Sequence, residues 1–288
     1  MLVGYVFYRR NLASPGKRSK ALYSMLFSSI FFWSVLGTSL VLCTAMLDAY
    51  DVNPRFVVRM VFGGSILSSL AISGLMAFLA RRFAVPRMLR GMTAGPLASS
   101  RLDGIFSALS ARMDVRADLM EASVGNAFSV GNAGKNVVAV SPVIVESLSV
   151  EEAEAVLAHE LSHLKNNDSL EKGLARMARL AFPFDPVLRL LEPAVHRERE
   201  LLADLSSVKY TGRPLALASA LIKVHSGPST GLNGGGAGYF IGSGKRGLLS
   251  LYPDLQKRVE MLLDMARHMR PEQKVAVPAQ HNRRSFLL

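Results

Sequence analysis

Two long runs without a charged residue, 21–47 and 60–80, limit what this chain can fold into. Charged residues bound the runs at Lys20, Asp48, Arg59 and Arg81. A helix needs about 20 apolar residues to cross a bilayer. The alternative is a signal peptide followed by a core helix, but the first run is too long for a signal peptide and lacks a small-residue cleavage site. We therefore predict a transmembrane hairpin over 21–80, with spans at 21–47 and 58–80.

Basic residues flank both outer ends of this hairpin. They lie in a basic N-terminal segment, 1–20, and just after the second run, at Arg81, Arg82, Arg87 and Arg90. Because positive residues collect on the cytoplasmic side, both ends are expected in the cytoplasm. The sequence thus predicts a multi-pass protein of the cell (inner or plasma) membrane, with the lipid bilayer as a partner and everything downstream of the hairpin in the cytoplasm.

The net charge of +12 raises the question of nucleic-acid binding. Much of this charge lies beside the membrane runs, where it sets topology and attracts anionic lipid. No zinc-finger spacing, RNA-binding aromatic motif or phosphate-binding loop occurs, so no nucleic-acid partner is predicted. The single cysteine, Cys43, lies in the first run and excludes both an intrachain disulfide and a thiolate zinc site.

The rest of the chain reads as one soluble domain over 101–270, after a linker at 81–100. We predict a helix over 101–120 and a β-hairpin with strands at 127–130 and 136–140. A glycine-rich loop occupies 227–247, a helix 252–269 and a basic tail 271–288. Prolines interrupt 170–192, and its charges argue against a membrane crossing, although an interfacial position is open. A helix over 193–210 is expected to end at Gly212.

The segment HELSH, 159–163, lies on a helix with an identifiable start. Ser149 and Glu152 form a capping-box pattern that begins a helix near residue 150 and carries it to about Asn166. His159 and His163 are four residues apart and therefore share a helix face. Zinc accepts such imidazoles, and Glu160 beside them can take a proton from a zinc-bound water. Two histidines leave a third ligand to be found.

The segment HRERELLAD, 196–204, can supply that ligand. On a helix, Glu200 and Asp204 share a face, which gives one carboxylate for the ion and another to orient a ligand histidine. Glu198 points to a different side, and His196 is a local competitor that does not account for Asp204. The prediction is one zinc ion per chain, held by His159, His163 and Glu200.

These motifs together resemble the HtpX and CAAX-prenyl-protease group of integral-membrane gluzincin metallopeptidases, most closely the HtpX-like branch. The likeness runs from Asn126 to Met261 and is carried by residues 126–128, 136–168 and 197–204. It implies a mainly α (α+β) fold in which a gluzincin-type domain has a small sheet next to the HELSH helix. It also implies a cytoplasmic zinc endopeptidase of membrane-protein quality control. In this reading Glu160 is the general base, and Asn126, Ala127 and Phe128 begin a strand that binds substrate backbone.

Two features depart from the family pattern. Its members often carry a His-Pro pair followed by an arginine near the C-terminus, whereas this chain has Tyr252 before Pro253, with Arg258 retained. A tyrosine hydroxyl can donate to an oxyanion, so Tyr252 and Arg258 are candidate catalytic residues. The family also usually has two more hydrophobic segments between the second histidine and the glutamate, so this chain resembles a short, two-span variant.

The function expected from these residues is hydrolysis of peptide bonds in misfolded or unassembled membrane proteins. One alternative is a signalling protease like the BlaR-type antirepressor proteases, although the short connection between the spans leaves no room for a sensor domain. The other is a non-catalytic membrane scaffold with a structural zinc site, but structural sites are closed and usually rich in cysteine. Substrate identity and oligomeric state do not follow from the sequence.

Overall fold

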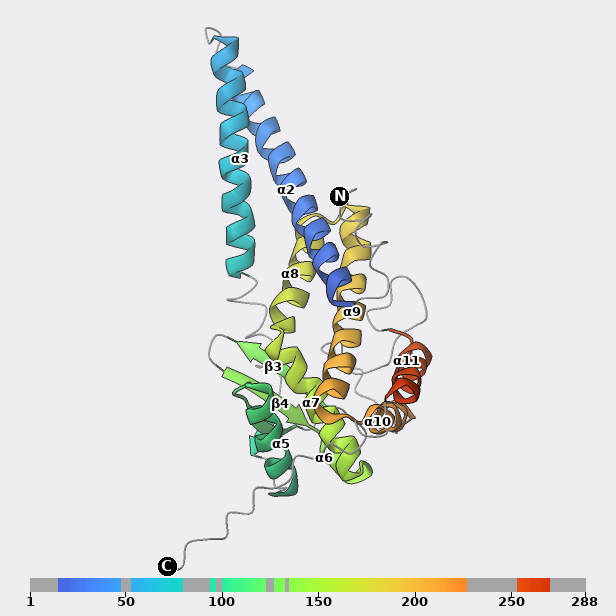
Figure 1. Ribbon diagram of the computed structural model, residues 1–288. Helices are drawn as coiled ribbons and strands as arrows, with labels where there is room; N and C mark the ends of the chain where they lie inside the picture. The colour runs from blue at the N-terminus through green and yellow to red at the C-terminus, as the bar shows by residue number, and fades with distance from the viewer. Residues whose placement is uncertain are drawn as a thin grey trace, which may run out of the picture.

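The computed structural model describes residues 15–47, 53–79, 94–96, 100–122, 127–132, 135–226 and 253–269. This part of the chain is mostly helical, with one small sheet, as the mainly α (α+β) prediction requires. Helices α2 (Pro15–Leu47) and α3 (Pro54–Leu79) lie side by side and project from one end of the molecule (Figure 1). The remaining helices and the sheet form the body below them.

The two N-terminal helices differ as membrane candidates. Residues Gly16–Ala45 of α2 are long and apolar enough to cross a membrane. The apolar stretch of α3, Val58–Ile72, is shorter. Ser39 of α2 and Ser65 of α3 are hydrogen-bonded at 2.8 Å, and Gly64 lets α3 approach Leu42. The two helices thus pack against each other, while the two-helix transmembrane hairpin stays a prediction.

The sheet has the strand order β1-β2-β4-β3. Strands β1 (Ala94–Pro96) and β2 (Asp118–Ala122) are antiparallel, β2 and β4 (Lys135–Val140) are parallel, and β3 (Phe128–Asn132) pairs antiparallel with β4. The predicted β-hairpin is thus confirmed by β3 and β4, and β3 is an edge strand of the described sheet. Residues 94–96 of the predicted linker belong to this sheet.

The helix predicted over 101–120 is too long. Helix α5 (Ser100–Met113) ends at Asp114, which has a positive φ of 53°, and Asp118–Ala122 form β2 instead. Pairing with β4 therefore prevails over the helical preference of the segment ADLMEA. After β4 the chain enters the short helix α6 (Pro142–Ser147) and then α7.

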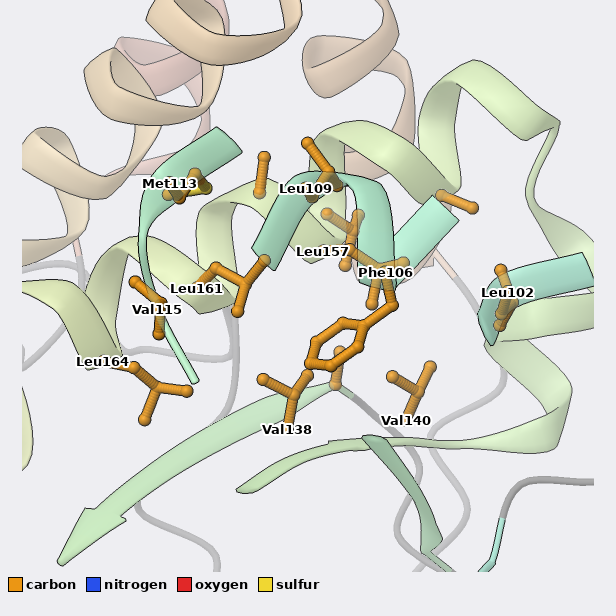
Figure 2. Packing of buried hydrophobic residues seen from close by; sticks show 14 of the residues in the cluster. Leu102, Phe106, Leu109, Met113, Val115, Val138, Val140, Leu157, Leu161 and Leu164 are labelled. Atoms are coloured by element: carbon orange, nitrogen blue, oxygen red, sulfur yellow. The ribbon is translucent and has the colours of Figure 1, made fainter. Parts of the chain in front are cut away.

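Helix α7 (Val150–Lys165) carries HELSH through the centre of the body. The predicted capping box is present: the Ser149 hydroxyl accepts from the Glu152 amide, and Glu152 accepts from the Ser149 amide. One apolar face of α7 packs with α5 and the sheet in the main core (Figure 2), built from Leu102, Phe106, Leu109, Met113, Val115, Val138, Val140, Leu157, Leu161 and Leu164. The other face of α7 meets the helices that follow.

Helices α8 (Asp168–Ala181) and α9 (Pro186–Thr211) form a hairpin beside α7. The predicted start of a helix at Pro193 is wrong, because α9 begins at Pro186 behind its N-cap Asp185 and continues through Pro193. An interior proline removes a helical hydrogen bond and its ring clashes with the carbonyl four residues earlier, at a cost of about 3 kcal/mol that tertiary packing offsets here. Gly212 ends α9 in the left-handed conformation at φ 68°, as expected. Helix α10 (Pro214–Ser226), not predicted, and α11 (Leu255–His268) complete the described part.

The N-terminal half of α2 lies against this α8–α9 hairpin (Figure 1). Their shared core consists of Leu22, Leu26, Ile30, Ala175, Ala178, Leu188, Leu191 and Val195. A third cluster joins α10 and α11 to α7 and α9 through Ala155, Val208, Leu217, Leu221 and Leu262. Both N-terminal and C-terminal helices are thus fixed against the helices that carry HELSH and HRERELLAD.

Candidate metal centre

The three predicted ligands come together from two helices. On α7, the Nε2 atoms of His159 and His163 lie 3.2 Å apart, with their rings edge to face. Glu200 of α9 places one oxygen 3.5 Å from His159 Nε2 and the other 3.6 Å from His163 Nε2. All three side chains are buried. One ligand atom from each residue lies within 4.8 Å of the others, so this group could hold a metal ion.

The spacing of these atoms fits a small tetrahedral ion. Two ligands about 2.0–2.1 Å from zinc, separated by the tetrahedral angle, lie about 3.3 Å apart. The two Nε2 atoms lie 3.2 Å apart, close to this value, and they lie 3.5 and 3.6 Å from the two different oxygens of Glu200. The donor set of two imidazoles and one carboxylate is that of catalytic zinc sites, which keep a fourth position for water. The three residues therefore offer the donor set of such a zinc site, on atoms that converge to within 4.8 Å.

Behind His159, a buried ion pair fixes the ring. Asp204 Oδ1 lies 3.0 Å from His159 Nδ1. Arg258 of α11 donates two hydrogen bonds to the same carboxylate, from Nε at 2.7 Å and from Nη2 at 2.6 Å. A third guanidinium nitrogen, Nη1, lies 3.6 Å from Glu200. A carboxylate this close to Nδ1 favours the tautomer with its proton on that nitrogen, which leaves the Nε2 lone pair of His159 to face the ion.

The pKa values around His159 reflect this network. Burial lowers the pKa of His159, but hydrogen bonds and charges from Asp204 and Glu200 outweigh it and raise that pKa to about 9. Burial likewise raises the pKa of Asp204, but the Arg258 guanidinium and His159 bring it below its usual value. For Glu200, the charges of Lys172 and His163 overcome burial and hold the pKa well below its usual range.

Behind His163, a second chain of contacts leads towards α2. Asp168 Oδ2 lies 2.6 Å from His163 Nδ1, and Asp168 Oδ1 lies 3.2 Å from Arg199 Nη1. Arg199 Nε donates to the Tyr23 hydroxyl at 2.6 Å, and its charge lies over the Tyr23 ring. Glu171 completes the group by pairing with both Arg199 and Tyr23. A residue of the apolar N-terminal helix thus contributes to the support of His163.

Glu160 has its own partner on the edge strand. Ser129 of β3 donates a hydrogen bond of 2.7 Å to Glu160 Oε2. Close packing brings β3 near α7, because a Cβ on Gly131 would come within 3.3 Å of the Leu164 side chain. Of the predicted substrate-binding residues, Ala127 and Phe128 are buried, whereas Asn126 lies outside the described residues, as does Tyr252.

The α8–α9 hairpin contributes two further titratable side chains, Lys172 and His196, to the surroundings of the candidate ligands. Lys172 Nζ lies 3.0 Å from Glu200 Oε1, on the side opposite Arg258 Nη1. Burial lowers the Lys172 pKa, but Glu200 and Asp168 more than compensate and raise it, so Lys172 remains charged. His196, the local competitor, is buried but does not belong to the converging group. Burial and the charge of Lys172 lower its pKa to about 3.

Asp168, Arg199, Tyr23, Ser129 and Lys172 do not emerge from the sequence reasoning. Asp168 had a readable signal, since it follows His163 by five residues at the start of the next helix, where a carboxylate can reach back. The others depend on tertiary contacts across 28 positions or more, as between Lys172 and Glu200. Glu198, which was expected on a different side, indeed pairs with Arg18 of α2 at 3.0 Å.

Comparison with known proteins decides the family. A model of the BlaR1 peptidase M56 family matches residues 30–243. The protease HtpX homolog of Aquifex aeolicus is 30% identical over 267 residues, which cover 74% of this chain and 88% of that protein. The chain belongs to the M56 peptidase family and is an HtpX-like membrane metallopeptidase. Within this HtpX-like chain, the match spans α3, the sheet and both helices that bear the ligands.

Other relatives match the HtpX-like chain over shorter ranges. The HtpX homolog of Pyrococcus furiosus is 32% identical over 197 residues, 54% of this chain and 68% of that protein. That of Methanopyrus kandleri is 32% identical over 182 residues, 50% of this chain and 57% of that protein. The match thus spans little more than half the length of the M. kandleri protein. A crystal structure of S. mikatae Ste24p shares 16% identity at a TM-score of 0.46, covering 83% of this chain and 65% of that one.

Proposed function

We propose that this chain is a membrane-anchored zinc endopeptidase that hydrolyses peptide bonds at the cytoplasmic face of the cell membrane. His159, His163 and Glu200 would hold one zinc ion per chain, with the body of the molecule in the cytoplasm. The observation that carries the proposal is the convergence of two imidazole nitrogens and a carboxylate at zinc-like spacing, with Glu160 next to them in sequence. When bound, zinc supplies a Lewis acid that brings the pKa of its coordinated water towards about 7.

In this reaction Glu160 moves the proton. Its carboxylate accepts a proton from the attacking water as the water oxygen bonds to the peptide carbonyl carbon. When the carbon–nitrogen bond breaks, the same proton passes to the leaving amine, so that acid and base roles alternate on one group. Ser129 holds one Glu160 oxygen at 2.7 Å and leaves the other for this transfer.

The remaining residues orient ligands and substrate. Asp168 is hydrogen-bonded to Nδ1 of His163, and Asp204 lies 3.0 Å from Nδ1 of His159, so that both carboxylates favour a free Nε2 atom on their histidine. Among the described strands β3 is an edge strand, whose outer side would offer backbone groups to an extended substrate, the binding mode called β-augmentation, with Asn126, Ala127 and Phe128 at its start. Tyr252 is the proposed donor to the oxyanion. Arg258 donates two hydrogen bonds to Asp204, so we assign it a positioning role rather than a catalytic one.

The proposed substrates are misfolded or unassembled membrane proteins. A direct test reconstitutes the purified chain with zinc and supplies an unfolded membrane-protein reporter beside its folded form. We expect cleavage of the unfolded reporter by the parent protein and none by Glu160→Gln, which retains its zinc. Loss of about four orders of magnitude or more in rate is typical when a group essential to the chemistry is removed. Equal cleavage by Glu160→Gln would reject the mechanism, and zinc binding without any peptidase activity would favour a non-catalytic scaffold.

The match to the BlaR1 peptidase family favours one further candidate, a regulatory protease with a dedicated substrate. The two functions differ in how many proteins are cut. Comparing new protein N-termini in cells that carry the parent protein or Glu160→Gln distinguishes them. Many cleaved membrane proteins would support quality control, while a single cleaved soluble regulator would support signalling.

A further inference from the structure

The turn between α8 and α9 carries exposed apolar side chains beside α2. Leu180, Phe184 and Leu190 are 61%, 62% and 50% exposed. The Phe184 ring packs edge to face on Trp33 of α2 at 4.8 Å, and Trp33 packs in the same way on Phe32. This patch therefore continues the exposed apolar surface of α2, where Phe27, Phe31, Phe32 and Leu36 are also exposed. A continuous apolar surface of this kind indicates a partner.

A buried carboxylate fixes the position of this turn along the axis of α2. Asp185, the N-cap of α9, is 2% exposed and accepts hydrogen bonds from Trp33 Nε1 at 2.9 Å and from the Val187 amide at 2.7 Å. The Ser29 hydroxyl also donates to it. An ionised carboxylate away from water is tolerated only when it is paired or hydrogen-bonded in this way. The turn is thus held at residues 29–33 of α2.

Helix geometry places that level at the boundary of a bilayer. A hydrocarbon layer about 30 Å thick corresponds to about 20 helical residues at 1.5 Å each. Counted back from Leu47, the end of α2, this layer begins near residue 28. Residues before that point make contacts that hydrocarbon would not accept, including the ion pair of Arg18 with Glu198 and the hydrogen bond of Arg199 to Tyr23.

Charges near the turn are arranged as a membrane interface requires. Arg179 pairs with the buried Glu192, and Asp185 is held by its three donors. Arg189 is exposed next to Leu190, where its guanidinium can extend to anionic headgroups while its stem lies along the apolar surface. The chemistry suited to this patch is therefore a lipid surface rather than a polar protein face.

We propose that the α8–α9 turn is a second membrane contact, in which Leu180, Phe184 and Leu190 dip into the cytoplasmic interface of the bilayer without crossing it. This proposal rests on the proposed anchoring of α2 in the membrane. Asp168 begins α8 and Glu200 lies near the middle of α9, so each is about 20 Å from the turn at 1.5 Å per residue. The hairpin thus holds the metal centre at a fixed distance from the membrane, which a substrate anchored in the same bilayer must bridge with about six extended residues.

Nitroxide labels on single cysteines test this contact in liposomes that contain anionic lipid. The background is Cys43→Ala, which removes the only cysteine. The test variant is Phe184→Cys, and Leu36→Cys reports on the middle of α2. The matched control is Leu215→Cys on α10, which is 57% exposed and apolar but lies away from the turn. Collision with dissolved oxygen, enriched in lipid, is compared with collision with a water-soluble nickel chelate.

The label at position 184 is expected to lose most of its collisions with the chelate and to gain collisions with oxygen, as at position 36. The label at 215 is expected to stay open to the chelate. A chelate-exposed label at 184 with a protected label at 36 would overturn the contact while leaving the anchor intact. Protection of 184 from both reagents would mean a protein neighbour and would also overturn it. A chelate-exposed label at 36 would reject the membrane anchoring of α2, and the membrane contact of the turn would be rejected with it.

Discussion

The two histidines of α7 occupy equivalent positions at the metal centre but are supported from opposite ends of the chain. Behind His159, Asp204 and Arg258 lead to the C-terminal helix α11, and both side chains are 1% exposed or less. Behind His163, Asp168 and Arg199 lead to Tyr23 on the N-terminal helix α2, and Glu171 there is 27% exposed. Charge interactions are stronger where water is excluded. The support of His159 is therefore expected to be the stiffer and the more costly to break.

Metal binding is therefore expected to depend on different parts of the molecule at the two histidines. The support of His159 lies wholly within the body and ties metal binding to the stability of the fold. The support of His163 includes a side chain from the helix proposed to enter the membrane. Changes behind His159 are thus expected to affect folding and metal together, while changes behind His163 affect metal binding with less effect on folding.

The largest effect is expected for Arg258→Met. The substitution leaves the buried Asp204 without its guanidinium partner, and an unpaired buried charge costs about 3–5 kcal/mol. Chemical unfolding should show this loss of stability together with reduced zinc content. The matched control is Arg267→Met on the exposed side of the same helix, expected within about 0.5 kcal/mol of the parent protein. Equal stability of the two variants would show that the Asp204–Arg258 pair does not support the fold.

The next effect is a pH dependence specific to His159. In metal-depleted protein its pKa is about 9, above the unfolded value of 6.5. The folded state thus holds a proton that the unfolded state loses, and the resulting stability, about 3 kcal/mol, is complete below pH 6.5 and lost as pH rises through 9. Zinc binding must displace this proton, so apparent zinc affinity should rise over the same range.

Unfolding and zinc titrations between pH 6 and pH 9.5 measure both trends. Asp204→Asn should weaken the pH dependence because it removes a main cause of the raised pKa, whereas Asp168→Asn should leave it in place. A pH dependence that is unchanged in Asp204→Asn and lost in Asp168→Asn would reverse the assignment of the two supports.

A smaller effect is expected on zinc affinity when either orienting carboxylate becomes an amide. Removing a partner of a metal-bound histidine typically weakens metal binding by about 10–100-fold. Asp204→Asn should fall near the upper end of this range and Asp168→Asn near the lower end, because Asp204 pairs with Arg258, which is 1% exposed, while Asp168 pairs with the more exposed Arg199, at 9%. Competition with a zinc chelator measures both. Unchanged zinc affinity in both variants would mean that these carboxylates do not set the histidine orientation.

The smallest effect is expected for Tyr23→Phe, which removes only the hydroxyl that contacts Arg199 and Glu171. A hydrogen bond of this kind contributes about 1 kcal/mol net, so zinc affinity should fall by less than about tenfold. Tyr210→Phe is the control, since the Tyr210 hydroxyl binds Lys165 away from the ligands. A zinc affinity identical to that of the parent protein would remove α2 from the support of His163.

The convergence of the three candidate ligands could be predicted from sequence because each lies on a helix whose period fixes its neighbours. His159 and His163, and likewise Glu200 and Asp204, are four residues apart, so a local rule places each pair on one face. The start of α7 was equally local, since Ser149 and Glu152 satisfy each other. Such features need no knowledge of the rest of the fold.

The contacts of Arg258 and Arg199 could not be predicted in this way because their partners are distant in sequence. Arg258 meets Asp204 across 54 positions, and Arg199 meets Tyr23 across 176. The start of α9 was missed for a related reason: Pro193 resembled a helix start, but packing of Leu188 and Leu191 against α2 keeps the preceding residues helical. Strand β2 was taken for helix because its pairing with β4 is likewise non-local.

The measurement that tests the central claim most directly is the zinc content of detergent-purified protein, for the parent chain, Glu160→Gln, Glu200→Gln and Glu198→Gln. Glu198 is a matched control because it is buried two residues away and pairs with Arg18. The account predicts one zinc per chain in all but Glu200→Gln, where zinc is lost or strongly reduced. Equal zinc in Glu200→Gln and the parent chain would contradict it, because Glu200 would then not be a ligand.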